Sequence, residues 1–404
     1  MHVLLIHQAF ASLDEPGGTR HHELARYLAS HGHQITIIAS PISYLTGKSR
    51  TAKIPWSEKQ VDGEFITILR TYTYPALHRS FTFRLISFFS FMISSFLIGL
   101  QVKNIDLVWG TSPPIFQGFT AWALSQIKRV PFLFEVRDLW PAFAVAVGVL
   151  RSHILIRLSE WLESFLVRHA DLVMVNSPGF TQHIKDRGAR HVELVPNGTD
   201  TNMFNPGVDG SAFRQSHQLD SKFVALYAGA HGLSNDLGIV LAAAKELLPQ
   251  KEIVFVLLGD GKDKPELQEQ ARLQGLDNVL FLPPIPKIEM PSALAAADVC
   301  IAILKPVELY KTTYPNKVFD YMASGKPVVL AIDGVIRKVI DQAGAGIAVP
   351  PGDPHALSQA VLRLAHNPDL AHTMGRQGRR YVDAHFDRNI LASKLMNIMR
   401  GMVG

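Results

Sequence analysis

The chain has 404 residues, of which 47% are hydrophobic and 19% charged, and its formal net charge is +5. This length exceeds one compact core and predicts two domains of similar size, whereas the diffuse positive charge, with no aromatic-interleaved basic patch, argues against a nucleic-acid-binding protein. The single cysteine, Cys300, excludes an intramolecular disulfide and a cysteine-based zinc site, and it is typical of a reducing compartment.

Short apolar runs alternate with amphipathic segments through the N-terminal half. The first run has no basic region before it and no small-residue cleavage site, so it predicts a β-strand and not a signal peptide. The alternation as a whole predicts βαβ units and a parallel sheet. The expected strands are 3–6, 34–39, 106–109, 132–136 and 171–175.

One segment departs from this pattern, because residues 85–102 carry no charge and two arginines precede them. Eighteen uncharged residues are at the lower limit for a bilayer span, but three serines would share one face of a helix. A membrane-proximal helix near 81–102 that lies in the bilayer interface is therefore favoured, with a core helix and a transmembrane span as the alternatives. The serines are Ser87, Ser90 and Ser94, and the expected lipid-facing residues are Phe88, Phe91 and Leu97.

A second series of strands and helices follows a stretch rich in Asn, Gly and Pro, 195–206, which marks a linker. Each half therefore predicts a doubly wound α/β domain. The expected strands of the second half are 223–227, 252–258, 279–282, 298–304, 328–332 and 345–349.

The most informative motif runs from residue 305 to 327. It follows an apolar strand, and its loop, which contains Thr312, Thr313 and Asn316, offers backbone N–H groups where a helix begins. Such a helix start binds anions, and Asp320, about one and a half turns later, can accept hydrogen bonds from a ribose diol. The motif predicts a nucleoside diphosphate site, and a strand–loop–helix unit without a ligand is the alternative.

Two glycine-containing turns are further candidates for diphosphate contacts. Gly17 and Gly18 follow the first strand and allow a tight turn whose amides can approach the phosphates; a flexible surface turn is the alternative. Gly229 and Gly232 end the first strand of the second half, and His231 between them can donate a hydrogen bond to phosphate; a surface histidine without a ligand is the alternative.

In their order and spacing, four motifs resemble those of glycosyltransferase family 4, over nearly the whole chain. This resemblance implies an α/β chain of the GT-B fold, with two Rossmann-like domains facing a central cleft. Residues 1–196 would form the domain that binds the acceptor, and residues 197–385 the domain that binds the nucleotide sugar. A C-terminal helix, 386–404, would return to the first domain. The motifs are Pro16-Gly-Gly-Thr-Arg20, Pro196-Asn-Gly-Thr-Asp200, Leu258-Gly-Asp-Gly261 and Phe319-Asp-Tyr-Met-Ala-Ser-Gly-Lys-Pro327.

A fifth motif, Glu135-Val-Arg-Asp-Leu-Trp-Pro141, is similar to a subgroup of bacterial envelope-polysaccharide transferases that act on polyprenyl-diphosphate-linked acceptors. The resemblance implies that Asp138 lies at the reacting sugar with Arg137 beside it. A surface ion pair or a helix cap is the alternative for Asp138.

The sequence also departs from the family pattern. The family's Glu-x7-Glu motif falls on Thr312 and Asp320, so its first carboxylate is missing, and the usual Arg and Lys of the loop after the first strand of the second domain are absent. Another cation must offset the diphosphate charge. Lys305 is the first candidate, because ligands of doubly wound sheets gather at the carboxyl ends of strands, and Lys317 and Lys311 follow it. For each of them a solvated lysine without a ligand is the alternative.

Together these features predict a retaining hexosyltransferase that requires no metal and no cofactor. The expected donor is a nucleoside diphosphate sugar, with UDP as the nucleotide, and the expected acceptor is a polyprenyl-diphosphate-linked saccharide of envelope polysaccharide synthesis, such as O-antigen. The expected location is the cytoplasm, peripheral to the inner face of the plasma membrane. The alternatives are a GT-B-fold UDP-sugar 2-epimerase and a non-catalytic, membrane-associated nucleotide-sugar-binding protein.

Overall fold

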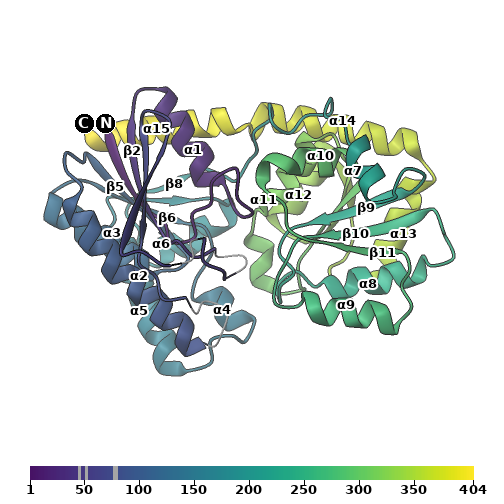
Figure 1. Ribbon diagram of the computed structural model, residues 1–404, viewed down its shortest axis with the longest axis horizontal. Coiled ribbons are helices and arrows are strands. Elements are labelled where there is room, and N and C mark those ends of the chain that lie inside the picture. Colours follow the sequence, from purple (N-terminus) through teal and green to yellow (C-terminus); the bar gives the residue numbers. More distant parts are fainter. Residues whose placement is uncertain (44–46, 51–52, 76–80) are drawn as a thin grey trace. The chain divides into compact units, whose positions relative to one another are not determined.

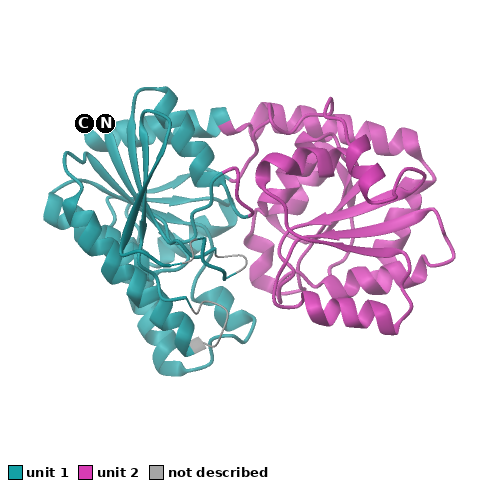
Figure 2. Cartoon of the chain, viewed as in Figure 1, with its two compact units in different colours: residues 1–12, 17–196, 389–404 teal, residues 13–16, 197–388 magenta. Residues whose placement is uncertain are grey.

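The computed structural model describes residues 1–404 apart from 44–46, 51–52 and 76–80. The chain forms two compact units (Figure 2). Unit 1 comprises residues 1–12, 17–196 and 389–404, and unit 2 comprises 13–16 and 197–388.

Unit 1 is built on an eight-stranded sheet in the order β3-β4-β2-β1-β5-β6-β7-β8, in which only β3 is antiparallel to its neighbour. Every residue of β1, β5 and β6 is buried, as expected for parallel strands covered on both faces. The strands are β1 (His2–Ile6), β2 (Gln34–Ala39), β3 (Ser57–Asp62), β4 (Ile66–Thr71), β5 (Leu107–Ser112), β6 (Phe132–Val136), β7 (Leu172–Val175) and β8 (Val192–Leu194).

The helices of unit 1 flank this sheet, and Figure 1 shows both chain termini in this unit. The last helix packs on the core of unit 1 through Leu391, Leu395 and Met399. The helices are α1 (Arg20–Ser30), α2 (Phe81–Gln101), α3 (Phe116–Lys128), α4 (Ala142–Ala146), α5 (His153–His169), α6 (Thr181–Asp186) and α15 (Arg388–Val403).

Unit 2 has a six-stranded, all-parallel sheet in the order β11-β10-β9-β12-β13-β14. Successive residues of β9 enter two different apolar clusters, Val224 and Leu226 one, Ala225 and Tyr227 the other, as the two-residue period of a strand requires. The strands are β9 (Phe223–Ala228), β10 (Ile253–Leu258), β11 (Val279–Leu282), β12 (Val299–Ile303), β13 (Val328–Ala331) and β14 (Gly346–Ala348).

The helices of unit 2 cover both faces of its sheet, which is the doubly wound arrangement. The α/β class with mainly parallel sheets is therefore confirmed. The helices are α7 (Ser211–Ser216), α8 (Leu237–Glu246), α9 (Lys264–Leu273), α10 (Met290–Ala295), α11 (Asn316–Ala323), α12 (Val335–Ala343), α13 (Pro354–Ala365) and α14 (Pro368–His385).

Sequence reasoning missed β3, β4 and β8. β3 reads Ser-Glu-Lys-Gln-Val-Asp, lies at the edge of the sheet and has no fully buried residue. β8, at the opposite edge, has only three residues, all half-buried. Because an edge strand is covered less than a central one, it lacks the apolar run on which the prediction depended.

Helix α2 docks its serine-bearing side on unit 1. Ser94 Oγ donates a hydrogen bond to the Tyr72 carbonyl oxygen (2.6 Å), and Ser90 Oγ accepts one from the Tyr74 backbone N–H (2.8 Å). Ser87 is buried as well. The serines therefore lie on the inner face of the helix, where Ser90 and Ser94 satisfy the backbone groups that follow β4.

The opposite side of α2 is an exposed apolar stripe, formed by residues spaced three or four apart. By length and composition alone, Thr82–Gln101 passes as a membrane span. Two of the three residues expected to face lipid are instead in the core, because Phe88 is 9% exposed and Phe91 is 0% exposed; that part of the prediction is wrong. The stripe consists of Ile86, Phe89, Ile93, Leu97 and Leu100.

Candidate active site

The loop that follows β9 in unit 2 encloses a lysine. Gly229 has a φ of 148°, and a Cβ built there would lie 2.5 Å from the Lys317 ammonium nitrogen, so a side chain at this position would collide with it. Lys317 Nζ lies 3.8 Å from the centroid of the Tyr227 ring. It is a buried atom with no hydrogen-bond acceptor among the residues that the structure describes. A desolvated ammonium without a counter-ion indicates a place for an anion.

Desolvation also sets the protonation of this lysine and of its neighbour His231. Burial lowers the pKa of Lys317 to about 7. Burial lowers the pKa of His231 to about 4, helped by the charges of Lys264 and Lys317, so the imidazole is neutral at pH 7 and carries one N–H donor. Neither ring nitrogen has a partner within the described part of the chain.

The glycine loop thus brings together three of the predicted ligand residues, Gly229, His231 and Lys317, and adds a fourth position. A Cβ at Gly259, the first glycine of the Leu258-Gly-Asp-Gly261 motif, would lie 1.9 Å from the Gly229 carbonyl oxygen and 3.3 Å from His231 Nε2. Gly232 faces open space. Sequence reasoning gave the Leu258-Gly-Asp-Gly261 motif no ligand role. The signal was available, because glycine turns that follow neighbouring parallel strands, here β9 and β10, meet at one edge of the sheet.

The other two candidate lysines already have acidic neighbours. The charge of Lys305 acts on Asp236 and Asp263, opposing the rise that burial causes in the pKa of each carboxyl. Lys311 forms an exposed ion pair with Glu308 (2.7 Å). Of the three lysines, Lys317 is therefore the one whose charge is best placed to be offset by a ligand.

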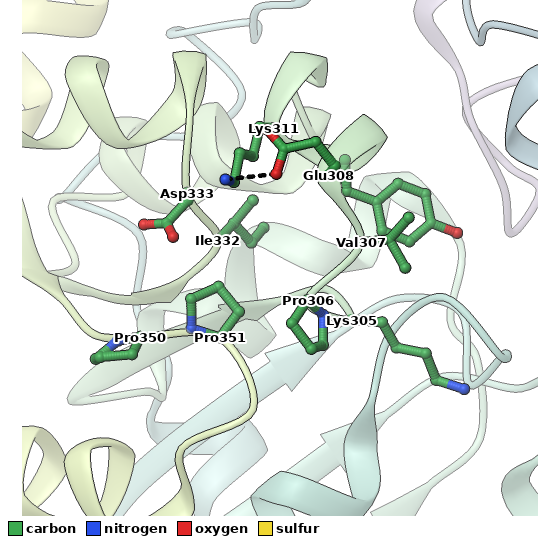
Figure 3. Close-up of a pocket in the computed structure, with 10 residues that line it drawn as sticks. Lys305, Pro306, Val307, Glu308, Lys311, Ile332, Asp333, Pro350 and Pro351 are labelled. Carbon is green, nitrogen blue, oxygen red and sulfur yellow. Dashed lines mark ion pairs between the residues drawn. The ribbon is translucent and has the colours of Figure 1, made fainter. Parts of the chain in front are cut away.

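Lys305 lies at the edge of a small pocket at the carboxyl ends of β12 and β13 (Figure 3). Its ammonium points away from the Lys311–Glu308 pair. The volume, about 270 Å³, is below the range of about 300–1,000 Å³ typical of ligand sites, so this pocket is too small for a whole nucleotide sugar. The lining residues are Lys305, Pro306, Val307, Glu308, Tyr310, Lys311, Ile332, Asp333, Pro350 and Pro351.

Helix α11 begins at Asn316, directly after Pro315, as the helix-start pattern predicted. The Asp320 carboxylate is buried, and inside unit 2 it accepts hydrogen bonds from Thr199 Oγ1 (2.7 Å) and Asn316 Nδ2 (3.3 Å) and pairs with Lys287 Nζ (2.6 Å). These contacts fix α11 to the start of unit 2. The ribose contact of Asp320 stays a prediction, and Lys287 is a partner that sequence spacing did not indicate.

Thr312 and Thr313 lie in the loop before α11. The Thr312 hydroxyl donates to the Leu309 carbonyl oxygen (2.6 Å), and the Thr313 hydroxyl donates to the Tyr310 carbonyl oxygen (2.8 Å). Both side chains therefore stabilise the short 3₁₀ turn Glu308–Thr312 that leads into the helix. Their phosphate contacts stay predictions.

Asp320→Ala should weaken binding of UDP by about 1.5–3 kcal/mol if the carboxylate also binds the ribose. It should lower the melting temperature too, because Lys287 would lose its buried partner. Lys287→Met is the matched variant, since it keeps the carboxylate but removes the same ion pair. Calorimetry that finds equal losses of UDP affinity in both variants would limit Asp320 to holding α11 in place.

In unit 1, the predicted residues follow the carboxyl ends of β1 and β6, which lie at the same edge of the sheet. Gly17 and Gly18 are exposed, and Gly17 has a φ of 147°. Arg137 Nη2 donates to the Pro113 carbonyl oxygen (3.0 Å). Asp138 does not cap a helix, because α4 begins four residues later without a side-chain cap.

Asp138 combines solvent exposure with a raised pKa. Desolvation by the surrounding protein raises the pKa of its carboxyl to about 6, against the opposing charge of Arg137. The side chain itself is exposed, so water moderates this shift. A carboxylate that titrates near neutral pH at the carboxyl edge of a doubly wound sheet is placed for work on a substrate.

Beneath this edge lies a buried charged cluster that sequence reasoning missed. Glu135 accepts a hydrogen bond from Arg20 Nε (3.0 Å) and another from His21 Nε2 (2.6 Å), and all three residues are at most 7% exposed. Arg20 also donates to the carbonyl oxygens of Val195 and Pro196, both at 2.7 Å. The cluster thus joins the Pro16–Arg20 motif, the motif around Asp138 and the last residues of unit 1 before unit 2.

Burial and neighbouring charges shift the pKa values of Glu135 and His21 and so determine which residues of this cluster are charged. Burial by itself would raise the pKa of Glu135, but the charge that His21 gains in acid and the charge of Arg20 outweigh burial and lower this pKa to about 2. Burial lowers the pKa of His21 to about 4 against the pull of Glu135. At neutral pH His21 is therefore uncharged and donates a hydrogen bond, and Arg20 is the counter-ion of Glu135. Across the described residues, no group of three or more His, Cys, Asp or Glu is placed to hold a metal ion.

Known proteins resemble this chain along its length. It is 23% identical over 398 residues to WcaI of Escherichia coli K12, named as a colanic acid biosynthesis glycosyl transferase, covering 94% of this chain and 95% of that one. Among solved structures, sucrose-phosphate synthase from Thermosynechococcus elongatus superposes with a TM-score of 0.80 at 19% identity, covering 99% and 98% of the two chains. HepE from Anabaena in complex with UDP-glucose superposes with a TM-score of 0.71 at 17% identity, covering 99% of this chain and 100% of that one.

Two family descriptions match successive parts of the sequence. Residues 17–198 match the glycosyl transferase 4-like domain, and residues 222–367 match the glycosyl transferases group 1 domain. Together these two matches include the glycine turns, the motif Glu135–Pro141 that contains Asp138, and the motif 305–327 that contains the start of α11. With the two doubly wound units and the superpositions above, these matches show that the chain belongs to glycosyltransferase family 4 and has the GT-B fold.

Proposed function

We propose that this protein is a retaining glycosyltransferase of bacterial envelope polysaccharide synthesis. It transfers a hexose from a UDP-sugar to a polyprenyl-diphosphate-linked saccharide at the cytoplasmic face of the plasma membrane. The observation that carries the donor assignment is Lys317, a desolvated ammonium beside a glycine loop with no anionic partner among the described residues. Full-length similarity to WcaI supports the pathway class, and HepE with bound UDP-glucose supports the nucleotide.

In this mechanism the sugar–diphosphate bond breaks and the acceptor oxygen bonds to the same sugar carbon on the same face. Negative charge then grows on the departing diphosphate. Lys317 and the N-terminal end of α11 offset that charge, which is the electrostatic role that a metal ion has in other transferases. The acceptor hydroxyl gives its proton to an oxygen of the leaving phosphate, so no strong side-chain base is needed.

Release of UDP tests the function directly. The protein is incubated with a panel of UDP-sugars, with and without a polyprenyl-diphosphate-linked saccharide, and UDP and product are measured. A transferase releases UDP in proportion to glycosylated acceptor. An altered UDP-sugar formed without acceptor would identify an epimerase, and binding without either product would identify a non-catalytic protein. Neither alternative is favoured, because the family and its named relatives are glycosyl transferases.

Asp138→Asn should lower transfer by about 100-fold while leaving UDP binding unchanged, because the reacting sugar would lose a carboxylate that stabilises the positive charge developing on it, and such electrostatic groups contribute about 10²–10³-fold. The wild-type rate should fall as the pH drops below about 6, where the Asp138 carboxylate takes up a proton. The variant should lack that acidic limb. Full activity in a folded Asp138→Asn protein, or an unchanged acidic limb, would remove Asp138 from the reaction.

A further inference from the structure

The layer of helices on one face of the unit 1 sheet has an apolar outer surface that extends beyond α2. α2 packs against α3, and α3 packs against α5 (Figure 1). Aromatic contacts join the three helices: the ring of Phe89 lies 4.8 Å from that of Phe116, and the ring of Trp122 lies 4.8 Å from that of Phe165. The outer sides of α2 and α5 therefore belong to one helical layer.

Helix α5 has an exposed apolar stripe of its own. Ile154, Leu158 and Trp161 are 72%, 56% and 61% exposed, and their spacing of four and three places them on one face of the helix. Arg157 is exposed on that face as well. The acidic residue next to the stripe, Glu160, forms an ion pair with Arg187 (3.2 Å).

The α5 stripe lies in the N-terminal half of its helix, whereas the α2 stripe begins near the N-terminal end of α2 and extends along most of that helix. In a doubly wound unit the helices run antiparallel to the strands, so helix N-termini lie at the carboxyl edge of the sheet. Asp138 follows β6 at that same edge. The chain between Asp138 and α5 adds Val145 and Val149, which are 39% and 41% exposed.

We propose that the exposed stripes of α2 and α5 form one surface that binds an anionic lipid bilayer and holds the Asp138 end of unit 1 at the membrane. This inference rests on the proposed function, which requires access to a lipid-linked acceptor. Large apolar side chains with Trp and Arg on one face are the composition of a helix that lies in a bilayer interface. The cation in the α5 stripe fits an anionic headgroup layer better than it fits a second copy of a chain whose own net charge is +5.

Vesicle flotation with the full chain tests this surface. The probes are phosphatidylcholine vesicles with and without phosphatidylglycerol. The variants are I154S/L158S/W161S in α5, I86S/F89S/I93S in α2, and R157Q; Leu273→Ser, which replaces a 69% exposed leucine in α9 of unit 2, is the matched control. Each triple variant should lose at least about tenfold in partitioning, which equals about 1.4 kcal/mol. R157Q should lose binding only to the anionic vesicles, and more at low salt than at high salt.

Three results would overturn the proposal: wild type that does not float with anionic vesicles, an α5 triple variant that floats as well as wild type, or equal loss in the Leu273→Ser control. If wild type is a dimer in solution, and the α5 triple variant is a monomer that floats as well as wild type, the surface binds a second copy of the chain and not a bilayer. Circular dichroism melting verifies that each variant is folded. UDP affinity by calorimetry and transfer to a short water-soluble acceptor are measured beside flotation, so a failed glycosyltransferase assignment stays distinct from a failed membrane surface.

Discussion

Lys317→Met should weaken binding of UDP and of the donor UDP-sugar by about 100-fold, or about 2.8 kcal/mol, because the diphosphate would lose a charge-assisted contact in a desolvated site. Without ligand, the same variant should melt at a higher temperature than wild type, because methionine removes the cost of holding an ammonium away from water. Calorimetry and melting curves measure both effects. Opposite signs for stability and affinity are the signature of a residue kept for a ligand.

The protonation of Lys317 makes the same experiment pH-dependent. The pKa of the free lysine is about 7, and a bound diphosphate raises it, so binding takes up a proton. UDP-sugar affinity of wild type should therefore fall as the pH rises from about 6 to about 9, whereas Lys317→Met should show no such dependence. Calorimetry in two buffers with different ionisation enthalpies counts the protons.

Lys305→Met is the comparison variant, since sequence reasoning ranked that lysine first. This variant should lose less UDP affinity than Lys317→Met, because the charge of Lys305 already interacts with the carboxyls of Asp236 and Asp263 and is therefore partly offset without a ligand. If Lys305→Met loses as much as or more than Lys317→Met, or if Lys317→Met binds UDP like wild type, the assignment of the diphosphate to Lys317 is wrong.

Glu135→Ala should destabilise unit 1 by about 3–5 kcal/mol, the usual cost of removing one partner from a buried ion pair. Arg20 would stay buried beside His21 without its counter-ion. All five tryptophans lie between residues 56 and 161, inside unit 1, so their fluorescence during urea unfolding reports this unit alone. Glu160→Ala is the matched control, because its exposed pair with Arg187 should contribute at most about 1 kcal/mol.

The buried glutamate also predicts acid sensitivity. Its folded pKa of about 2 lies below the ordinary value of 4.5, so its contribution to stability is complete above about pH 4.5 and disappears as the pH falls toward 2. Wild type should therefore lose more stability than Glu135→Ala over that interval. Equal pH dependence in the two proteins, or a mild effect of the substitution, would show that the cluster does not hold unit 1 together.

Local chemistry made much of unit 2 predictable. β9, β12 and β13 are buried on both faces and therefore read as apolar runs. Pro315 immediately precedes α11, and Gly325, with a φ of 68°, lies just beyond its end; both are signals that depend on neighbouring backbone conformation. The edge strands β3 and β8 gave no such signal, because partial cover removes the need for apolar residues.

The α/β class, the glycine turns after β1 and β9, and the helix start at Asn316 were predictable from the amino-acid sequence, because each depends on the period of apolar residues or on the conformation of a few consecutive residues. The contacts between distant side chains became known from the three-dimensional fold. It placed Lys317 beside Gly229, tied Asp320 to Lys287, paired Arg20 with Glu135 115 positions away, and turned the serines of α2 inward. Such contacts depend on how strands that are far apart in the sequence pair in the sheet. Burial at these contacts then sets the charge that each group carries, and the spacing of residues in the sequence does not encode that burial.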